Sequence, residues 1–233
     1  GRGAQAAQTL MQRFLLGYPE VGLVKMPMVI GVSATPKRFL DLIANAEHTV
    51  TTHKVTVPAE EVRKSGLLKD RILIHHPEAT TTAEMALLEE AARRWGQMTT
   101  AWGAYCHDEK EQIIWPVLVV QVENGSDRQL TKTDLGAALT VIESAIGRRL
   151  NEGEVAHAMH DTGDLDVGGR RVRKVEASRI EADKNIGVVF FKTSLSTGWD
   201  CPRAEVMMSF RRAEDHTYIA QLLGRMVRTP LAR

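Results

Sequence analysis

One glutamine and two arginines recur at helical spacing near the carboxyl end of the chain. Gln221, Arg225 and Arg228 stand at positions i, i+4 and i+7 of a helix that we predict over residues 215–228, ending before Pro230. At about 100° per residue, these three side chains fall on one stripe. The apolar residues of the segment fall on the opposite side: Ile219, Leu222, Leu223, Met226 and Val227.

Two arginines on a rigid element are suited to binding phosphate. A guanidinium is always charged, and its fork of donors matches phosphate oxygens. In phosphoryl transfer, such an arginine neutralises charge on the γ-phosphate in the transition state. Gly224 lies beside the stripe and would permit close approach of another surface. The alternative interpretation of the same spacing is an ordinary solvated helix face.

A second segment with candidate polar groups is the loop at residues 193–202, which reads TSLSTGWDCP. It follows the apolar run at residues 187–191, so we predict a loop at the carboxyl end of a strand, where α/β folds bind ligands. Gly198 permits unusual backbone angles, and Asp200 offers an acceptor. By itself, this is also a common loop composition.

A third segment, residues 29–36, reads VIGVSATP and ends a predicted strand in Ser33-Ala34-Thr35. Hydroxyl groups at such a strand end can relay hydrogen bonds between neighbouring loops. This triplet alone is weak evidence for a function.

The elements that position these residues follow from hydrophobic patterning. Short runs rich in Val and Ile predict strands covered on both faces: residues 28–32, 71–74, 117–122, 187–191 and 205–210. Apolar residues at three- and four-residue steps predict helices over residues 83–105 and 135–150, the latter with Thr133 or Asp134 as N-cap. Strands alternating with helices favour an α/β fold with a mainly parallel sheet.

The composition fits a globular protein without a membrane segment. Hydrophobic residues make up 43% of the 233 residues and charged residues 25%. The formal net charge of +1 excludes a global basic field, so nucleic-acid contacts must come from local patches. Two cysteines, Cys106 and Cys201, indicate no disulfide framework, and we expect a cytoplasmic protein. No apolar run approaches the ~20 residues that span a bilayer.

Together and in this order, SATP, TGWDCP and QLLGRMVR resemble motifs III, V and VI of superfamily-two helicases. The resemblance is strongest to DEAD/DEAH-type helicase proteins related to the restriction (R) subunit of type III restriction enzymes. Residues 62–70 (VRKSGLLKD) also resemble that family, as does the strand at 117–122 with its following ENG, at motif IV. The resemblance covers essentially the whole chain.

This resemblance implies a RecA-like fold of the P-loop NTPase type. Residues 1–45 would be the end of a first, ATP-binding motor domain that includes motif III. Residues 46–233 would be the second helicase motor domain with motifs IV, V and VI.

The resemblance also implies roles for single residues. Arg225 and Arg228 would reach the γ-phosphate across the cleft between two motor domains, with Gln221 leading the motif. Residues expected at the nucleotide edge are Gly198, Asp200 and Gly224. Candidates for contact with the nucleic-acid backbone are Thr193, Ser194, Ser196 and Thr197, and which of them makes it stays open. Ser33 and Thr35 would couple hydrolysis to domain movement.

Two elements of an ATPase are missing from the sequence. The nearest approach to a P-loop, residues 17–22, is followed by Leu23 and has no lysine or hydroxyl. No DExH or DExD tetrapeptide precedes Ser33. We therefore expect ATP and Mg²⁺ to be held mainly by an upstream domain. The parent protein would be an ATP-hydrolysing helicase or translocase, and this chain alone would be inactive.

The expected partners are the upstream RecA-like domain of the same parent chain and a nucleic acid; we favour double-stranded DNA, and the choice between DNA and RNA stays open. A methyltransferase subunit of a restriction-modification system is a further candidate. We expect any endonuclease domain beyond Arg233 and no membrane partner. The rival hypothesis is a nucleic-acid-binding or interaction module that has the RecA-like shape but no ATP chemistry. A P-loop and a DExH/D box upstream of Gly1 would favour the motor.

The remaining signals have more ordinary interpretations. His157 and His160 lack the further ligands of a zinc site, so we predict structural histidines and no metal. Residues 161–174 predict a loop or hairpin, whose basic cluster suggests a solvated turn or, alternatively, phosphate contacts: Arg170, Arg171, Arg173 and Lys174. Helical spacing places three aromatic residues in the core rather than in a base-stacking platform: Trp95, Trp102 and Tyr105. Trp199 could pack beneath its loop or lie at the nucleic-acid face, and we favour packing.

Overall fold

The computed structural model describes residues 13–15, 17–32, 37, 40, 53–75, 84–126, 129–160, 162–193, 195, 199–211 and 216–231. The chain divides into two compact units, Gly1–Thr56 and Val57–Arg233. The sequence places a domain boundary between residues 45 and 46. Assignment of the first unit to a preceding motor domain stays a prediction.

The first unit contains a short 3₁₀ helix, η1 (Pro19–Val21), closed by a hydrogen bond of 2.8 Å from the Tyr18 N–H to the Leu23 carbonyl. None of its described residues is buried. The strand predicted at residues 28–32 is wrong: these residues form no ladder, and Ile30 is 82% exposed. An apolar run becomes a strand only when a neighbouring strand pairs with its backbone, and no described residue does so here.

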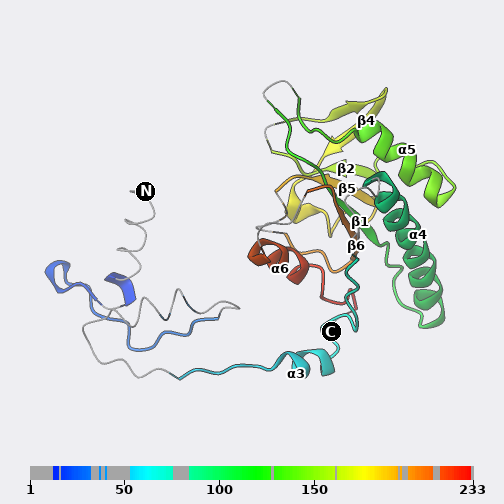
Figure 1. Ribbon diagram of the computed structural model, residues 1–233. Coiled ribbons are helices and arrows are strands. Elements are labelled where there is room, and N and C mark those ends of the chain that lie inside the picture. The colour runs from blue at the N-terminus through cyan, green and yellow to red at the C-terminus, as the bar shows by residue number, and fades with distance from the viewer. Residues whose placement is uncertain are drawn as a thin grey trace. The chain divides into compact units, whose positions relative to one another are not determined.

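The second unit is an α/β structure built on a six-stranded sheet (Figure 1). The strands are β1 (Val117–Gln121), β2 (Val155–His157), β3 (Leu165–Val167), β4 (Arg170–Lys174), β5 (Val188–Phe191) and β6 (Ala204–Ser209). They lie in the order β3-β4-β2-β5-β1-β6, and every neighbouring pair is parallel except β3 and β4. The expected α/β class with a mainly parallel sheet is confirmed.

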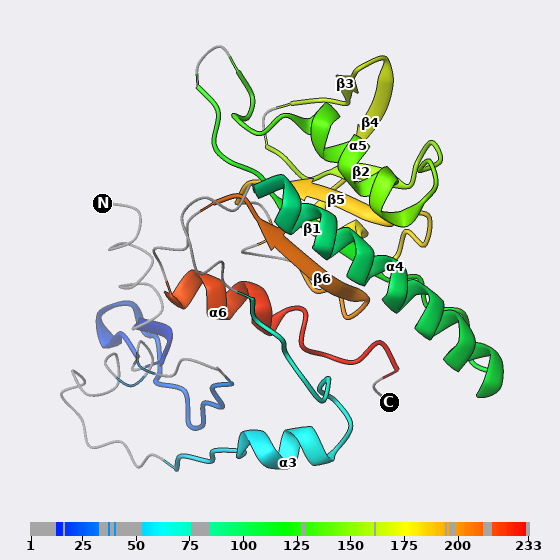
Figure 2. The ribbon, with the colours of Figure 1, turned by 45° about the vertical axis from the view of Figure 1, so that its right-hand side comes forward.

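Both faces of the sheet are covered, as the continuous apolar runs predict. Leu118 and Val120 of β1 pack in one core cluster with residues of α4 (Glu84–Asp108) and α5 (Leu135–Ile146). Val117 and Val119 belong to the cluster on the opposite face, which includes Leu222 of α6 (His216–Gly224). Figure 2 shows α4 and α5 on one side of the sheet and α6 on the other. This three-layer arrangement places the loop between β5 and β6 on the face that carries α6.

Helices α4 and α5 follow the predicted periodicities. In α4, Leu88, Ala92 and Trp95 are buried, and the Trp95 indole donates to the Pro116 carbonyl at 2.9 Å. The Asp134 side chain caps α5 by accepting from the Ala137 N–H at 3.0 Å. Tyr105, predicted in the core, is instead 48% exposed, because the end of α4 extends past the sheet (Figure 2). None of the helices described is both long and apolar enough to cross a membrane.

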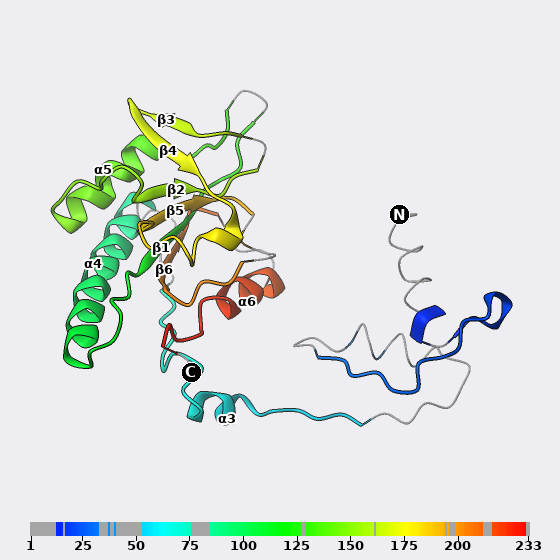
Figure 3. The ribbon, with the colours of Figure 1, turned by 180° about the vertical axis from the view of Figure 1, so that it is seen from behind.

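Residues 57–75, at the start of the second unit, are irregular apart from α3 (Ala59–Lys64). The strand predicted at residues 71–74 is wrong, since this segment has no ladder partner among the described residues and Leu73 is 68% exposed. Just before it, Leu68 forms an isolated antiparallel bridge with Arg228. The two segments, one after α3 and one after α6, lie side by side (Figure 3).

Candidate functional site

The predicted site residues fall into two groups. Six lie outside the described residues, and their roles stay predictions: Ser33, Thr35, Ser194, Ser196, Thr197 and Gly198. The others come from the loop between β5 and β6 and from the end of α6: Thr193, Asp200, Gln221, Gly224, Arg225 and Arg228.

Helix α6 ends at Gly224, so the prediction of a helix through Arg228 is wrong. After Gly224 the chain tightens into a turn, in which the Arg225 N–H donates to the Leu222 carbonyl at 3.2 Å. It then pairs with residues 67–69. The Lys69 N–H donates to the Val227 carbonyl at 2.8 Å, and the Thr229 N–H donates to the Leu67 carbonyl at 3.1 Å. These tertiary bonds hold the chain after the turn in an extended pairing instead of a further helical turn.

Both arginines contact consecutive residues of the loop before β6. Arg225 is half-buried, and its Nη1 donates to the Trp199 carbonyl at 2.5 Å. Arg228 Nη2 donates to Asp200 Oδ2 at 2.6 Å, and the two side chains are 54% and 45% exposed. The fold therefore brings together the two segments that the sequence singles out for phosphate chemistry. Gln221 lies exposed on the last turn of α6.

Beneath these contacts lies an apolar support. Leu222 and Met226 are buried in the same cluster as Trp199, which is fully buried, so the predicted packing of Trp199 is confirmed. Its indole Nε1 has no hydrogen-bond partner among the residues that the structure describes, so the contacts of the ring seen here are packing contacts. A Cβ atom built at Gly224 meets no atom of the described residues within 4 Å.

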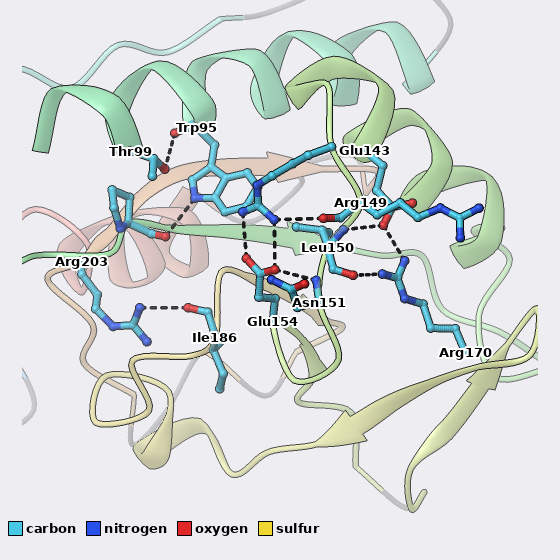
Figure 4. A network of polar contacts seen from close by, with 12 residues as sticks. Trp95, Thr99, Glu143, Arg149, Leu150, Asn151, Glu154, Arg170, Ile186 and Arg203 are labelled. Atoms are coloured by element: carbon cyan, nitrogen blue, oxygen red, sulfur yellow. Dashed lines mark hydrogen bonds and ion pairs between the residues drawn. The ribbon is translucent and has the colours of Figure 1, made fainter. Parts of the chain in front are cut away.

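A buried arginine holds the end of the loop that carries Asp200. Arg203 is 1% exposed, and its guanidinium donates to backbone carbonyls of five residues: Trp115, Ile180, Glu181, Asp183 and Ile186. Its bond to Ile186 is drawn in Figure 4. Burial lowers the pKa of Arg203, with Cys201, Glu181 and Asp183 opposing this. Burial also raises the pKa of the nearby Cys201 thiol, which makes it unreactive.

The carboxyl ends of β1, β5 and β6 form a second polar group, which the sequence reasoning did not find. Gln121 Nε2 donates to the Lys192 carbonyl at 2.8 Å, and the Ser209 hydroxyl donates to Gln121 Oε1 at 2.9 Å. Thr193, the residue after Lys192, is exposed. A glutamine at the end of an otherwise apolar strand was the available signal. These hydrogen bonds of Gln121 hold the ends of β1, β5 and β6 together at the carboxyl edge of the sheet, where α/β folds bind ligands.

The basic cluster at residues 170–174 is not a solvated turn. It forms strand β4, and three of its residues make ion pairs: Arg170 with Glu143, Arg171 with Asp164, and Arg173 with Asp183, at 2.6, 2.5 and 2.5 Å. Figure 4 shows Arg170 reaching Glu143. The turn itself is Gly168-Gly169, at φ 63° and 80°, within the predicted hairpin. Phosphate would have to compete with these carboxylates.

His157 has the structural role that the sequence predicts. It is fully buried at the end of β2; its Nε2 donates to the Gly163 carbonyl at 3.0 Å, and its Nδ1 accepts from the Met159 N–H at 3.3 Å. This pattern requires the neutral ring with the proton on Nε2. Burial lowers the pKa of His157, consistent with that neutral form.

No protein-family model, no curated protein and no solved structure matches this chain. Its function must therefore be inferred from the site itself.

Proposed function

We propose that this chain is the second motor domain, with the end of the first, of an ATP-dependent DNA helicase or translocase of the type III restriction kind. The observation that supports this most is the contact of Arg225 and Arg228 with Trp199 and Asp200. It joins the two most specific helicase-like segments of the sequence. The mainly parallel α/β sheet is compatible with a RecA-like domain.

In this mechanism Arg228 binds the γ-phosphate of ATP. Its guanidinium is about half exposed, and a phosphate oxygen can take the place that Asp200 occupies on the fork. Arg225 lies deeper, with its Nη1 on the Trp199 carbonyl, and holds the loop while adding positive charge. ATP and Mg²⁺ are held mainly by the preceding motor domain. Closure of the cleft completes the site, and hydrolysis releases it.

Nucleic acid would follow the carboxyl edge of the sheet. Thr193 is exposed there, beside the network of Gln121 and Ser209. The cycle of closure and release would move the two motor domains along double-stranded DNA. A methyltransferase subunit and a nuclease domain belong to the same proposal as partners of the parent protein.

The test is DNA-stimulated ATP hydrolysis by the full-length parent protein. We expect Arg225→Ala and Arg228→Ala each to reduce turnover by about a thousandfold, the lower range for an arginine finger. The matched control is Arg94→Ala, which removes a 53% exposed arginine of α4 and should leave turnover unchanged. The chain by itself should show no hydrolysis. Wild-type turnover in Arg225→Ala and Arg228→Ala would refute the assignment.

The rival function is a nucleic-acid-binding module without ATP chemistry, which the polar carboxyl edge alone would also support. In that case the full-length protein binds double-stranded DNA but does not hydrolyse ATP. Binding through phosphates should weaken steeply with salt, by a slope of about −0.9 per phosphate contact in a double-logarithmic plot. Binding that is insensitive to salt would count against this mode.

A further inference from the structure

The backbone that carries Arg225 and Arg228 is tied to the last turn of α6 only as far as Val227, whose N–H donates to the Leu223 carbonyl at 3.1 Å, and a segment far upstream holds the residues around Arg228. Residues 67–69 pair with residues 227–229, with Leu68 opposite Arg228. Since α6 ends at Gly224, this short antiparallel pairing replaces the helix as the support of Arg228. Anything that displaces residues 67–69 therefore displaces the arginine.

The Lys69 side chain adds three further contacts. Its ammonium group donates to the Met226 carbonyl at 2.7 Å and to the Ala204 carbonyl at 3.0 Å, and it pairs with Glu205 Oε2 at 3.2 Å. An ammonium group has three donors, so all are used. The Lys69 and Glu205 side chains are only 17% and 8% exposed. Burial lowers the pKa of Lys69, and the charge of Glu205 opposes that shift.

Glu205 is itself fixed from the other face of the sheet. The indole of Trp102, in α4, donates to Glu205 Oε1 at 3.0 Å. A continuous chain of contacts thus runs from α4 through β6 to Lys69 and ends on the Met226 carbonyl, between the two arginines. A buried ion pair contributes little net stability, but it fixes geometry when every donor and acceptor is satisfied.

We propose that Lys69 is a positioning residue for the Arg225–Arg228 pair, acting through the Met226 carbonyl and supported by Glu205. This inference rests on the proposed ATPase function. Its physical basis is that a displacement of about 1 Å at a catalytic group can cost about a hundredfold in rate. Lys69 contacts neither nucleotide nor nucleic acid in this role.

The experiment compares Lys69→Met with Lys64→Met in the full-length protein. Methionine keeps most of the length of the lysine side chain but removes the ammonium group. Lys64 is the matched control, because it lies just upstream on α3 and its side chain is 72% exposed. We expect Lys69→Met to lower kcat by at least about tenfold, with KM for ATP changed less than about threefold. Lys64→Met should match the wild type.

A second readout separates positioning from folding. In Lys69→Met, amide hydrogen exchange should accelerate at residues 225–229 while β1 and β5 stay protected. If Lys69→Met does not fold, Glu205→Gln serves instead, since it retains an acceptor for the Trp102 indole and removes only the charge that balances Lys69. The same local acceleration and loss of kcat are then expected.

The outcomes distinguish the two proposals. Full kcat in Lys69→Met and Glu205→Gln, together with lost activity in Arg225→Ala, overturns the role of Lys69 and leaves the proposed function standing. Unchanged exchange at residues 225–229 in the variant used also overturns it. Full activity in Arg225→Ala refutes the proposed function, and the positioning role fails with it.

Discussion

The guanidinium of Arg228 lies 2.6 Å from the carboxylate of Asp200, and this ion pair joins the segment after α6 to the loop before β6. Both side chains are about half exposed, so water reaches the pair. A carboxylate in this position orients the arginine and also competes with any phosphate that approaches it. The pair therefore orients the Arg228 guanidinium but contributes little to the stability of the fold.

The substitution Asp200→Asn tests whether the ion pair orients Arg228 or stabilises the fold. Because exposed ion pairs are worth about 0–1 kcal/mol, the free energy of unfolding should fall by less than about 1 kcal/mol in urea titrations. In the full-length protein, ATP turnover should fall by at least about tenfold, since Arg228 loses its orientation. Glu90→Gln breaks an exposed ion pair on α4 as a control and should leave turnover unchanged. A stability loss above about 2 kcal/mol would assign Asp200 a structural role instead.

Arg203, unlike Asp200, should contribute strongly to the stability of the fold. Arg203→Met leaves the buried carbonyls that it serves without their donor, each at a cost of about 1–3 kcal/mol. We expect a loss of at least about 3 kcal/mol in the free energy of unfolding, measured by urea denaturation. Arg94→Met, at an exposed ion pair, should change stability by less than about 0.5 kcal/mol. Similar stabilities for the two variants would contradict the role assigned to the Arg203 contacts.

Two glycines should respond to alanine with opposite signs. A Cβ atom at Gly187 would lie 2.8 Å from Cζ2 of the Trp95 ring, which is buried and hydrogen-bonded and so cannot easily give way. Gly187→Ala should destabilise by about 1–3 kcal/mol. Gly103 lies inside α4, and beyond its own helix backbone no atom of the described residues lies within 4 Å of such a Cβ atom, so Gly103→Ala should stabilise by about 0.5–1 kcal/mol. Thermal unfolding of both variants measures the two changes in stability. If Gly187→Ala is as stable as the wild type, the Trp95 ring can move to make room for the added methyl group.

His157 should make stability depend on pH below neutrality. Burial lowers its pKa in the folded chain, opposed by the Gly163 hydrogen bond and by Asp164, while Lys174 acts in the same direction as burial. In the unfolded chain its pKa is about 6.5, so the unfolded state binds the proton first. Stability contributed by the neutral ring is present above about pH 6.5 and is lost as pH falls, by at most about 1.4 kcal/mol per pH unit.

The measurement is the free energy of unfolding across this pH range for wild type and His157→Gln. The variant should have a shallower slope, because it removes the group that takes up the proton. His107→Gln replaces an exposed histidine of α4 and serves as the matched control. Equal slopes for the wild type and His157→Gln would mean that other groups cause the acid loss of stability.

Local sequence patterns determined the centre of the fold. Continuous apolar runs predict β1, β5 and β6 because a strand covered on both faces needs an apolar side chain at nearly every position. The three- and four-residue periods predict α4 and α5, and Asp134 marks the start of α5 through its side-chain cap. His157 could also be assigned a structural role, since the sequence offers no further ligands at the spacing of a zinc site. For Trp199 the sequence favoured packing over a position at the nucleic-acid face, and its burial confirms the packing.

Only the tertiary structure decided where α6 ends and what holds the arginines. The spacing of Gln221, Arg225 and Arg228 favours a longer helix, but the chain turns after Gly224, and Val227 and Thr229 then pair with residues 67–69. The runs at residues 28–32 and 71–74 likewise contain enough apolar side chains for strands but have no described partner. Propensity and periodicity are properties of neighbouring residues in the chain. The pairing of Lys69 with Met226 and Glu205 joins residues far apart in sequence, so only folding brings them into contact.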